Sequence, residues 1–359
     1  MTQGTVAGTN IRKTADWQLY LPPIATYILL TFLTNAYFMG DTLRYTDSIV
    51  ARLEGGYFYF WEFGHLLWRP LIWLLYRATQ PLTQRIVGPN VGFQVTIVLV
   101  TVTWLFGLVG VIVLPSLLKL WTKSRWIICS VSIGFITTNC FINYMHTGCP
   151  YVAGLTLILV GLFLMFVRQD SKWNFLWSGI VLALSVCFWF PFILALPAVF
   201  FAPLLLSDTI PMSQRVRLLA YSVIACAVVG TFSYLMIGLF GLGLRNFAGF
   251  HAWFNDASHG LSNLGGLPRA VFGVARSLIN MGDDGRVFKR YVIKDPFNPV
   301  SIFDLVKLSL WKLTLFYLFV AALTFSLIRF PLGRRVLILN MLVAVPLFIF
   351  AIFLFDAGQ

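Results

Sequence analysis

Ionisable side chains gather in the segment Gly40–Pro70, which directly follows the first long apolar run of the chain. The segment contains four acids, one histidine and three arginines. Ionisable groups beside a membrane usually take part in chemistry or ligand binding rather than in packing. A carboxylate at such a position can act as a general base that deprotonates an acceptor hydroxyl.

Asp41 is the first candidate for a catalytic acid or base. The residues from Asp41 to Leu53 form an amphipathic pattern, which predicts a surface helix where the first span leaves the bilayer. One predicted stripe contains Leu43, Thr46, Ile49, Val50 and Leu53, and the other contains Asp41, Arg44, Ser48 and Arg52. Asp is also a favoured N-cap, so a purely structural role is an even alternative. Arg44 and Tyr45 are candidate substrate-binding residues on the same helix.

Glu62 and His65 are three residues apart, and Arg69 follows four residues later. In a helix this spacing places all three side chains on one face. Pro70 disfavours helical geometry at Arg69, which also allows a helix that begins only there. A histidine alone is usually a packing or interfacial residue, but this one has an acid and an arginine beside it. Glu62 and His65 are therefore candidate catalytic residues, and Arg69 is a candidate for substrate binding.

The composition defines the class of protein. Hydrophobic residues make up 59% of 359 and charged residues 11%, with a mean hydropathy of +0.83. These values indicate a polytopic α-helical membrane protein. Its net charge of +13 is explained by an excess of Lys and Arg in the loops of a membrane protein rather than by nucleic-acid binding. The first apolar run has no small-residue cleavage site and is read as a retained signal anchor. The five cysteines show no spacing typical of zinc ligands.

Nine apolar runs are expected to span the membrane. They cover residues 20–38, 91–114, 126–143, 150–167, 174–189, 191–206, 216–240, 308–328 and 336–355. The loops on one side carry twelve cations against three acids, whereas the short loops on the other side, 143–150 and 189–191, carry no Lys, Arg or acid. The positive-inside rule then places the N-terminus in the cytoplasm and the segment Gly40–Pro70 on the outer face.

Two long outer loops follow from this topology, residues 39–90 and 241–307, attached to a single transmembrane domain over residues 1–359. In the first loop, Leu66–Tyr76 contains Arg69 and Pro70 and is expected to lie along the membrane surface as an interfacial helix. Aromatic residues of this loop are expected to form a belt at the headgroups: Tyr57–Trp61, Trp68, Trp73 and Tyr76.

Cations in the second outer loop are candidates for binding a lipid phosphate. They are Arg286, Lys289 and Arg290, although a solvated loop is an equal alternative for each of them. The short turn Asn143–Pro150 is expected to bring Tyr144 or His146 toward the first loop, and His146 is a further candidate for substrate binding. The spans contain almost no acid or base, which argues against an ion-coupled transporter.

The chain resembles the GT-C superfamily of integral membrane glycosyltransferases, which includes protein O-mannosyltransferases and the aminoarabinose transferase of lipid A. The resemblance covers the topology through residue 240. Locally it depends on Gly40-Asp41 with Tyr45, and on Gly64-His65 through Arg69-Pro70. The chain departs from the family at Thr42, because many relatives have a second acid directly after the first. It also ends at Gln359, whereas many relatives continue with further spans or an outer domain. The chain is therefore either a compact member or a fragment that lacks a C-terminal part.

The resemblance implies an inverting transfer of a sugar from a polyprenyl-phosphate donor to a protein, lipid or glycan acceptor. Asp41 would be similar to the acid of the family's first outer loop, and Lys289 and Arg290 would hold the donor phosphate. No cofactor is required. Some relatives use a divalent metal, but the acids of the segment Gly40–Pro70 have no recognisable metal-ligand spacing, so no metal site is indicated.

We therefore expect a lipid-linked sugar transferase in a bacterial-type cytoplasmic membrane, acting on its outer side, although an endoplasmic reticulum location would give the same charge pattern. The main alternative is a transporter or flippase for lipid-linked glycans, which should have polar residues along a path through the spans. A third is a structural subunit of an envelope complex, in which Asp41 and His65 would tolerate substitution.

Overall fold

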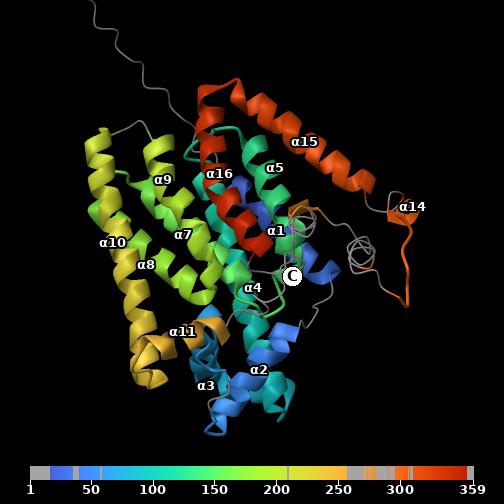
Figure 1. The fold of residues 1–359 in the computed structure, drawn as a ribbon, viewed down its shortest axis with the longest axis vertical. Coiled ribbons are helices and arrows are strands. Elements are labelled where there is room, and N and C mark those ends of the chain that lie inside the picture. Colours follow the sequence, from blue (N-terminus) through green and yellow to red (C-terminus); the bar gives the residue numbers. More distant parts are fainter. Residues whose placement is uncertain are drawn as a thin grey trace, which may run out of the picture.

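A computed structural model of the chain shows a bundle of helices (Figure 1). The structure describes residues 17–34, 40–56, 59–207, 210–256, 271, 274–275, 278–279, 290, 296–305, 307 and 310–353. These residues contain helices and turns but no β-strand. The expectation of an all-α membrane protein is confirmed at this level.

The N-terminal part begins with α1 (Trp17–Leu33) and α2 (Gly40–Leu53), continues through a short 3₁₀ helix, η1 (Phe63–His65), and reaches α3 (Trp68–Val87). The helices that follow are α4 (Val91–Leu118), α5 (Arg125–Ile136), α6 (Asn139–Tyr144), α7 (Tyr151–Val167), α8 (Lys172–Phe188), η2 (Phe190–Leu194), α9 (Leu196–Leu206), α10 (Met212–Met236), the π-helical turn η3 (Ile237–Gly241), α11 (Phe247–Asp256), α14 (Ile302–Leu305), α15 (Trp311–Ile328) and α16 (Pro331–Phe353).

Within the described residues, each of the nine predicted spans overlaps a helical segment, although a turn at 137–138 divides the span 126–143 between α5 and α6. The structure separates the spans into two groups. Four helices are long and apolar enough to cross a membrane, over 91–118, 212–241, 311–328 and 331–349. The other five are shorter apolar helices: α1, α5, α7, α8 and the pair η2–α9. The described chain therefore has the character of a membrane protein, whereas a count of nine spanning helices stays a prediction.

The starts of several helices are fixed by side-chain caps, which satisfy backbone N–H groups left over in the first turn. The Asn90 side chain accepts a hydrogen bond from the N–H of Phe93 at the start of α4. The hydroxyl oxygens of Ser124 and Ser171 do the same at the starts of α5 and α8. Local sequence thus sets where three of the apolar helices begin.

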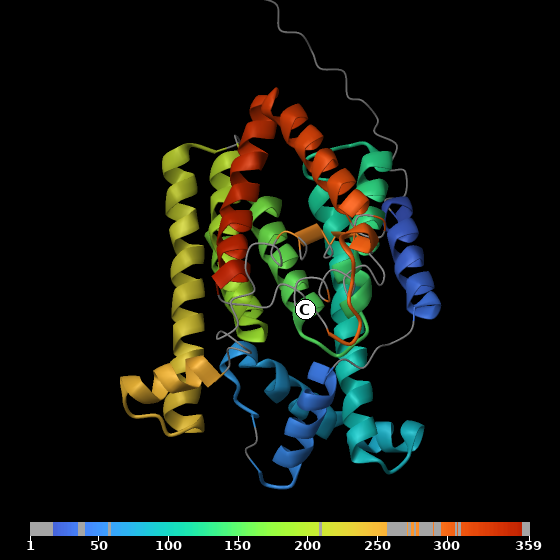
Figure 2. The ribbon, with the colours of Figure 1, turned by 45° about the vertical axis from the view of Figure 1, so that its right-hand side comes forward.

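The bundle has two distinct ends (Figures 1 and 2). At one end lie cationic turns, those that follow α4, α7, α9 and α15. There Arg125, at the start of α5, donates to Gln18 of α1, and Arg215 of α10 donates to the carbonyl oxygen of Leu204 in α9. Arg335 of α16 donates to the carbonyl oxygen of Leu205 at the same end. At the opposite end lie α2, η1, α3 and α11, so the cationic turns and the segment Gly40–Pro70 are on opposite ends of the molecule.

The buried face of α2 differs from the predicted stripe. Thr42, Tyr45 and Ile49 are buried, and their spacing places them on one helical face. Leu43, predicted on the apolar stripe, is 52% exposed, while Ser48, predicted on the polar stripe, is buried, with its hydroxyl donating to the carbonyl oxygen of Arg44 at 2.6 Å. The helix was predicted correctly, and Thr46 and Ile49 of its predicted apolar stripe are buried, but Leu43 and Ser48 were assigned to the wrong faces.

The predicted aromatic belt is also wrong in part. Trp68 and Tyr76 are fully buried rather than placed at headgroups. The Trp68 indole N–H donates to the carbonyl oxygen of Gly148, and the Tyr76 hydroxyl donates to Gln94, both at 3.0 Å. Both residues belong to α3, which extends from Trp68 to Val87 against α4 and is not among the helices apolar enough to span. The face of α3 that contains Trp68 and Tyr76 therefore packs against the bundle and is held there by hydrogen bonds.

Candidate functional site

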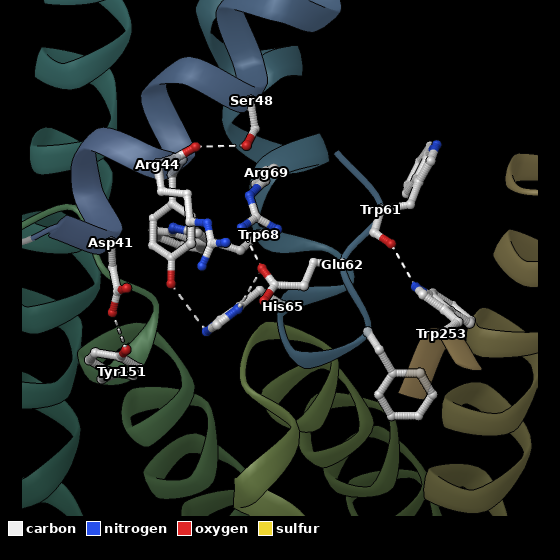
Figure 3. Close-up of polar contacts among 12 residues, drawn as sticks. Asp41, Arg44, Ser48, Trp61, Glu62, His65, Trp68, Arg69, Tyr151 and Trp253 are labelled. Carbon is white, nitrogen blue, oxygen red and sulfur yellow. Dashed lines mark hydrogen bonds and ion pairs between the residues drawn. The ribbon is translucent and has the colours of Figure 1, made fainter. Parts of the chain in front are cut away.

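Asp41 lies in the first turn of α2, where the partial positive charge of a helix N-terminus favours a carboxylate. Its Oδ2 atom accepts a hydrogen bond of 2.8 Å from the hydroxyl of Tyr151, the first residue of α7 (Figure 3). Asp41 is half-buried, and its Oδ1 atom accepts no hydrogen bond from the described residues. The carboxylate is therefore oriented by one donor and still has an oxygen for a ligand.

Glu62 is the centre of a buried polar network. Its Oε2 atom accepts a hydrogen bond from Nη2 of Arg69 and lies 3.3 Å from Nδ1 of His65. The exposed fractions of Glu62, His65 and Arg69 are 6%, 3% and 0%. The three residues lie together, but not on one helical face as the first alternative required, and α3 begins next to Arg69 as the second alternative allowed. Glu62 is extended, His65 ends the 3₁₀ helix η1, and Arg69 belongs to α3, which begins two residues before Pro70.

Tyr45 extends the network from α2. Its hydroxyl lies 3.1 Å from Nε2 of His65, and the guanidinium of Arg69 lies 4.7 Å from the centre of its ring. The bonds form a consistent chain if His65 is neutral with its proton on Nδ1: Tyr45 donates to Nε2, and Nδ1 donates to Glu62. Burial lowers the pKa of His65, while its hydrogen bond to Glu62 opposes this shift. Burial also raises the pKa of Tyr45 well above its ordinary value.

The network and the Asp41 carboxylate are neighbours. The rings of His65 and Tyr151 lie 6.4 Å apart, and the rings of His65 and Tyr45 lie 5.3 Å apart. Figure 3 shows Asp41 with Tyr151 on one side of His65, and Glu62 with Arg69 on the other. The two acids therefore differ in their environment: Glu62 is buried and paired with a cation, whereas Asp41 is partly accessible.

The turn Asn143–Pro150 joins α7 to this site. The Thr42 hydroxyl donates to the carbonyl oxygen of Thr147 at 2.5 Å, and Trp68 donates to the next carbonyl, that of Gly148. Gly148 has a φ of +84°, and a Cβ atom there would lie 2.9 Å from Cβ of Leu99. Only glycine fits this close approach without strain. The turn thus contacts the first loop through Thr147 and Gly148, whereas the prediction had named Tyr144 or His146.

His146 is placed in this turn but is not bonded to the network. It is 5% exposed, and neither of its ring nitrogens has a hydrogen-bond partner among the described residues. The structure therefore brings His146 to the correct end of the bundle without assigning it a contact. Its role in substrate binding stays a prediction.

The predicted cationic site in the second outer loop falls mostly outside the described residues. Arg286 and Lys289 lie outside them, and Arg290 is described alone as a half-buried residue. In the first loop, Arg44 is exposed, with its guanidinium 5.1 Å from the ring of Tyr59. Of the predicted cations, only Arg69 is therefore placed in the network.

In the described part of the chain, no three His, Cys, Asp or Glu residues are grouped closely enough to hold a metal ion. The side chain of Glu62 accepts from one cationic side chain and contacts an imidazole, and Asp41 accepts from a tyrosine. The arrangement is suited to proton transfer and to orientation of a polar substrate.

Sequence reasoning missed Tyr151 and Gly148. Tyr151 was counted inside the predicted span 150–167, although a tyrosine just beyond a polar turn at the membrane face is a recognisable signal. Gly148 lies inside the sequence Thr147-Gly148-Cys149, where nothing local shows that two other helices approach it. Its role follows from tertiary contacts.

Comparison of the chain with protein-family models, with curated proteins and with solved structures found no match. The likeness to membrane glycosyltransferases therefore depends on the short motifs and on the topology alone.

Proposed function

We propose that the protein is a GT-C-like glycosyltransferase that moves a sugar from a polyprenyl-phosphate donor to an acceptor at the outer face of a membrane. The observation that carries the proposal is the partly accessible Asp41 carboxylate, oriented by Tyr151 beside the buried network of Glu62, His65, Arg69 and Tyr45. This combination lies on the end of the bundle opposite to the cationic turns, which the positive-inside rule assigns to the cytoplasm.

The difference between the two acids supports a division of roles. A general base must be within hydrogen-bond reach of the proton that it removes. Asp41 meets this requirement, because its Oδ1 atom has no partner among the described residues, whereas Glu62 is 6% exposed and already accepts from Arg69. We therefore assign Asp41 as the base and Glu62 as a residue that fixes His65 and Arg69.

In the proposed reaction, the acceptor hydroxyl or amine approaches Oδ1 of Asp41. Its oxygen or nitrogen forms a bond to the anomeric carbon of the donor sugar while the bond between that carbon and the phosphate oxygen breaks. The acceptor proton moves to Asp41, and the bonding electron pair leaves with the polyprenyl phosphate. Tyr151 keeps the carboxylate oriented through its bond to Oδ2. Cations near the phosphate would stabilise the negative charge of the leaving group.

The test measures release of polyprenyl phosphate by the purified protein in lipid, with a panel of polyprenyl-phosphate sugars and envelope extract as the acceptor source. We expect Asp41→Asn to lower the rate by a factor of about 10² to 10⁴, the range for loss of a general base. Tyr151→Phe should lower it less, since the carboxylate is retained but loses its orienting donor.

Asp47→Asn is the matched control, because Asp47 is an exposed acid on the same helix and has no place in the site. Full activity of Asp41→Asn in a folded, membrane-inserted protein would refute the assignment. If no donor supports release although the wild-type protein binds these lipids, the flippase alternative is favoured, and transport of the lipid between leaflets becomes the measurement.

A further inference from the structure

Two backbone carbonyls flank Glu62, and each accepts a hydrogen bond from a side chain far along the sequence. The indole N–H of Trp253, in α11, donates to the carbonyl oxygen of Trp61 at 2.8 Å. The hydroxyl of Tyr234, near the end of α10, donates to the carbonyl oxygen of Phe63 at 3.1 Å. Figure 3 shows the first of these bonds beside the polar network. The backbone is therefore fixed on both sides of Glu62.

The side chain of Phe63 supplies a second set of contacts, to the same two helices and to η2. Its ring centre lies within 4.5–5.1 Å of four aromatic rings, those of Phe190, Tyr234, Trp253 and Phe254. Aromatic pairs at these distances stabilise a packing arrangement beyond the area that they bury. Because Phe63 is the residue between Glu62 and Gly64 in η1, this packing also limits how the 3₁₀ turn can rotate.

The orientation of the network depends on this segment. Glu62 and His65 are three residues apart on a single turn of 3₁₀ helix, and one Glu62 oxygen contacts both His65 and Arg69. A small rotation of η1 would move the Glu62 carboxylate away from Nδ1 of His65, a contact that is already 3.3 Å long. The contact between Nδ1 of His65 and Glu62, which selects the tautomer of His65, is thus longer than the bond from Tyr45 to Nε2 and is the easier of the two to break.

We propose that Tyr234 and Trp253 are positioning residues, which couple the end of α10 and the helix α11 of the second outer loop to the hydrogen-bond state of His65. When α11 is docked, Glu62 holds the proton of His65 on Nδ1, and Nε2 accepts from Tyr45. When the Trp253 or Tyr234 donor is removed, η1 loses one anchor, and His65 samples both tautomers. The effect on transfer rests on the proposed function, but the effect on His65 does not.

The experiment uses the full-length protein in lipid, labelled with ¹⁵N and ¹³C in its histidines. The chain has four histidines, so the imidazole signals can be resolved, and His65→Gln assigns the relevant one. We expect wild-type His65 to show a single neutral form with the proton on Nδ1. Trp253→Phe and Tyr234→Phe, which keep the rings and remove only the donors, should each split or average this signal between the two tautomers.

Two variants serve as matched controls, because each removes a comparable long-range donor elsewhere in the molecule. Trp104→Phe removes the indole bond to Thr31, and Tyr317→Phe removes the hydroxyl bond to the carbonyl oxygen of Val271. Neither variant should change the His65 signal. In transfer assays, Trp253→Phe should lower kcat by about tenfold with little change in KM, as expected for a residue that acts on a catalytic arrangement rather than on binding.

If the His65 signal is unchanged in both Trp253→Phe and Tyr234→Phe while the proteins remain folded, the proposal is overturned. If one variant fails to fold, the other decides, since each bond flanks Glu62 on its own side. A changed His65 signal in a protein without any transfer activity would support the positioning role and refute the proposed function, so the two failures are distinguishable.

Discussion

The polar end of the bundle and the C-terminal helix pair are held in place in different ways. In the most apolar window of α4, 39% of the residues are buried inside the molecule, whereas the corresponding fractions are 0% for α15 and 6% for α16. At the polar end, α2, α3 and the turn Asn143–Pro150 are joined by side-chain hydrogen bonds and one buried ion pair. The C-terminal pair instead presents large apolar side chains outward.

The difference shows where this sequence specifies a unique arrangement. Lipid chains are as apolar as leucine, so burial of apolar surface gives little drive for one helix to associate with another inside a membrane. Buried polar groups are costly without partners, so each hydrogen bond at the polar end selects one arrangement of its helices. We infer that substitutions at the polar end affect stability strongly, and that substitutions on the outward faces of α15 and α16 do not.

The largest effect is expected for Glu62→Gln. The substitution leaves Arg69 charged, 0% exposed and without its carboxylate partner. Loss of one member of a buried ion pair typically costs about 3–5 kcal/mol of the free energy of unfolding. Titration of the protein in mild micelles with a denaturing detergent would measure it. Glu54→Gln, at an exposed acid just after α2, is the control and should change the stability by less than about 0.5 kcal/mol.

The double variant Glu62→Gln/Arg69→Met sharpens this prediction. It should recover part of the loss, because replacement of both members of a buried pair leaves no unpaired charge. A double variant as unstable as Glu62→Gln alone would show that packing around Arg69, including its contact with the Tyr45 ring, outweighs the charge.

The second prediction compares a Leu→Ala substitution in α4 with a Leu→Ala substitution in the C-terminal helix pair. Leu99 of α4 is 0% exposed and packs in a buried cluster with Tyr45 and Trp68, so Leu99→Ala should cost about 2–5 kcal/mol. Leu318 of α15 is 60% exposed, and Leu318→Ala should change the stability by no more than about 0.5 kcal/mol. Equal losses in the detergent titration would contradict the distinction between the two regions and would indicate that another protein surface covers α15.

The third prediction concerns the turn that carries Tyr151. Gly148 and Gly88 both have a positive φ, of +84° and +82°, but only Gly148 has neighbours in the path of a Cβ atom, at 2.9 Å from Leu99 and 3.2 Å from Thr42. Gly148→Ala should therefore cost about 1–3 kcal/mol more than Gly88→Ala, since backbone strain is common to both and overpacking is not. A similar loss for both variants in thermal unfolding would mean that the turn can move away from α2.

This glycine also shows what the sequence could predict. The apolar runs and the amphipathic pattern after Asp41 are local signals, and they correctly predicted helical segments. The spacing of Glu62, His65 and Arg69 indicated one site, but these residues meet from an extended residue, η1 and α3 rather than on one helical face. Local signals carry no information on which distant segment fills a given space. The contacts of Gly148 with α2 and α4 therefore could not be predicted.

Two positions of α2 were assigned to the wrong face for a related reason. The sequence pattern treats Leu43 as a core residue and Ser48 as a surface residue, since hydropathy alone decides in the absence of tertiary information. In a membrane protein, apolar side chains are stable against lipid, and polar side chains face inward where they find partners. Thr42 and Tyr45 have such partners in Thr147 and His65, and they determine which face of α2 is buried.

The smallest expected effect is a dependence of stability on pH that originates from His65. Burial lowers its pKa below the ordinary value of 6.5, while its hydrogen bond to Glu62 opposes the shift. The unfolded chain therefore binds a proton more readily than the folded protein when the pH lies between the lowered pKa and 6.5. The free energy of unfolding should fall as the pH falls below about 6.5, by at most about 1.4 kcal/mol per pH unit, and should be insensitive to this group above it.

Thermal unfolding of the wild type and of His65→Gln between about pH 5.5 and 7.5 measures this contribution. The wild type should lose stability toward the acidic end, and the variant should show a flatter profile, because glutamine does not titrate there. The charged groups that act on His65, Glu62, Arg69 and Asp41, are present in both proteins, so the difference between the two profiles isolates the imidazole. If the wild type instead gains stability on acidification, His65 is protonated in the folded protein. The Glu62 carboxylate would then outweigh burial, and the tautomer chain from Tyr45 to Glu62 would be replaced by an imidazolium that donates from both nitrogens.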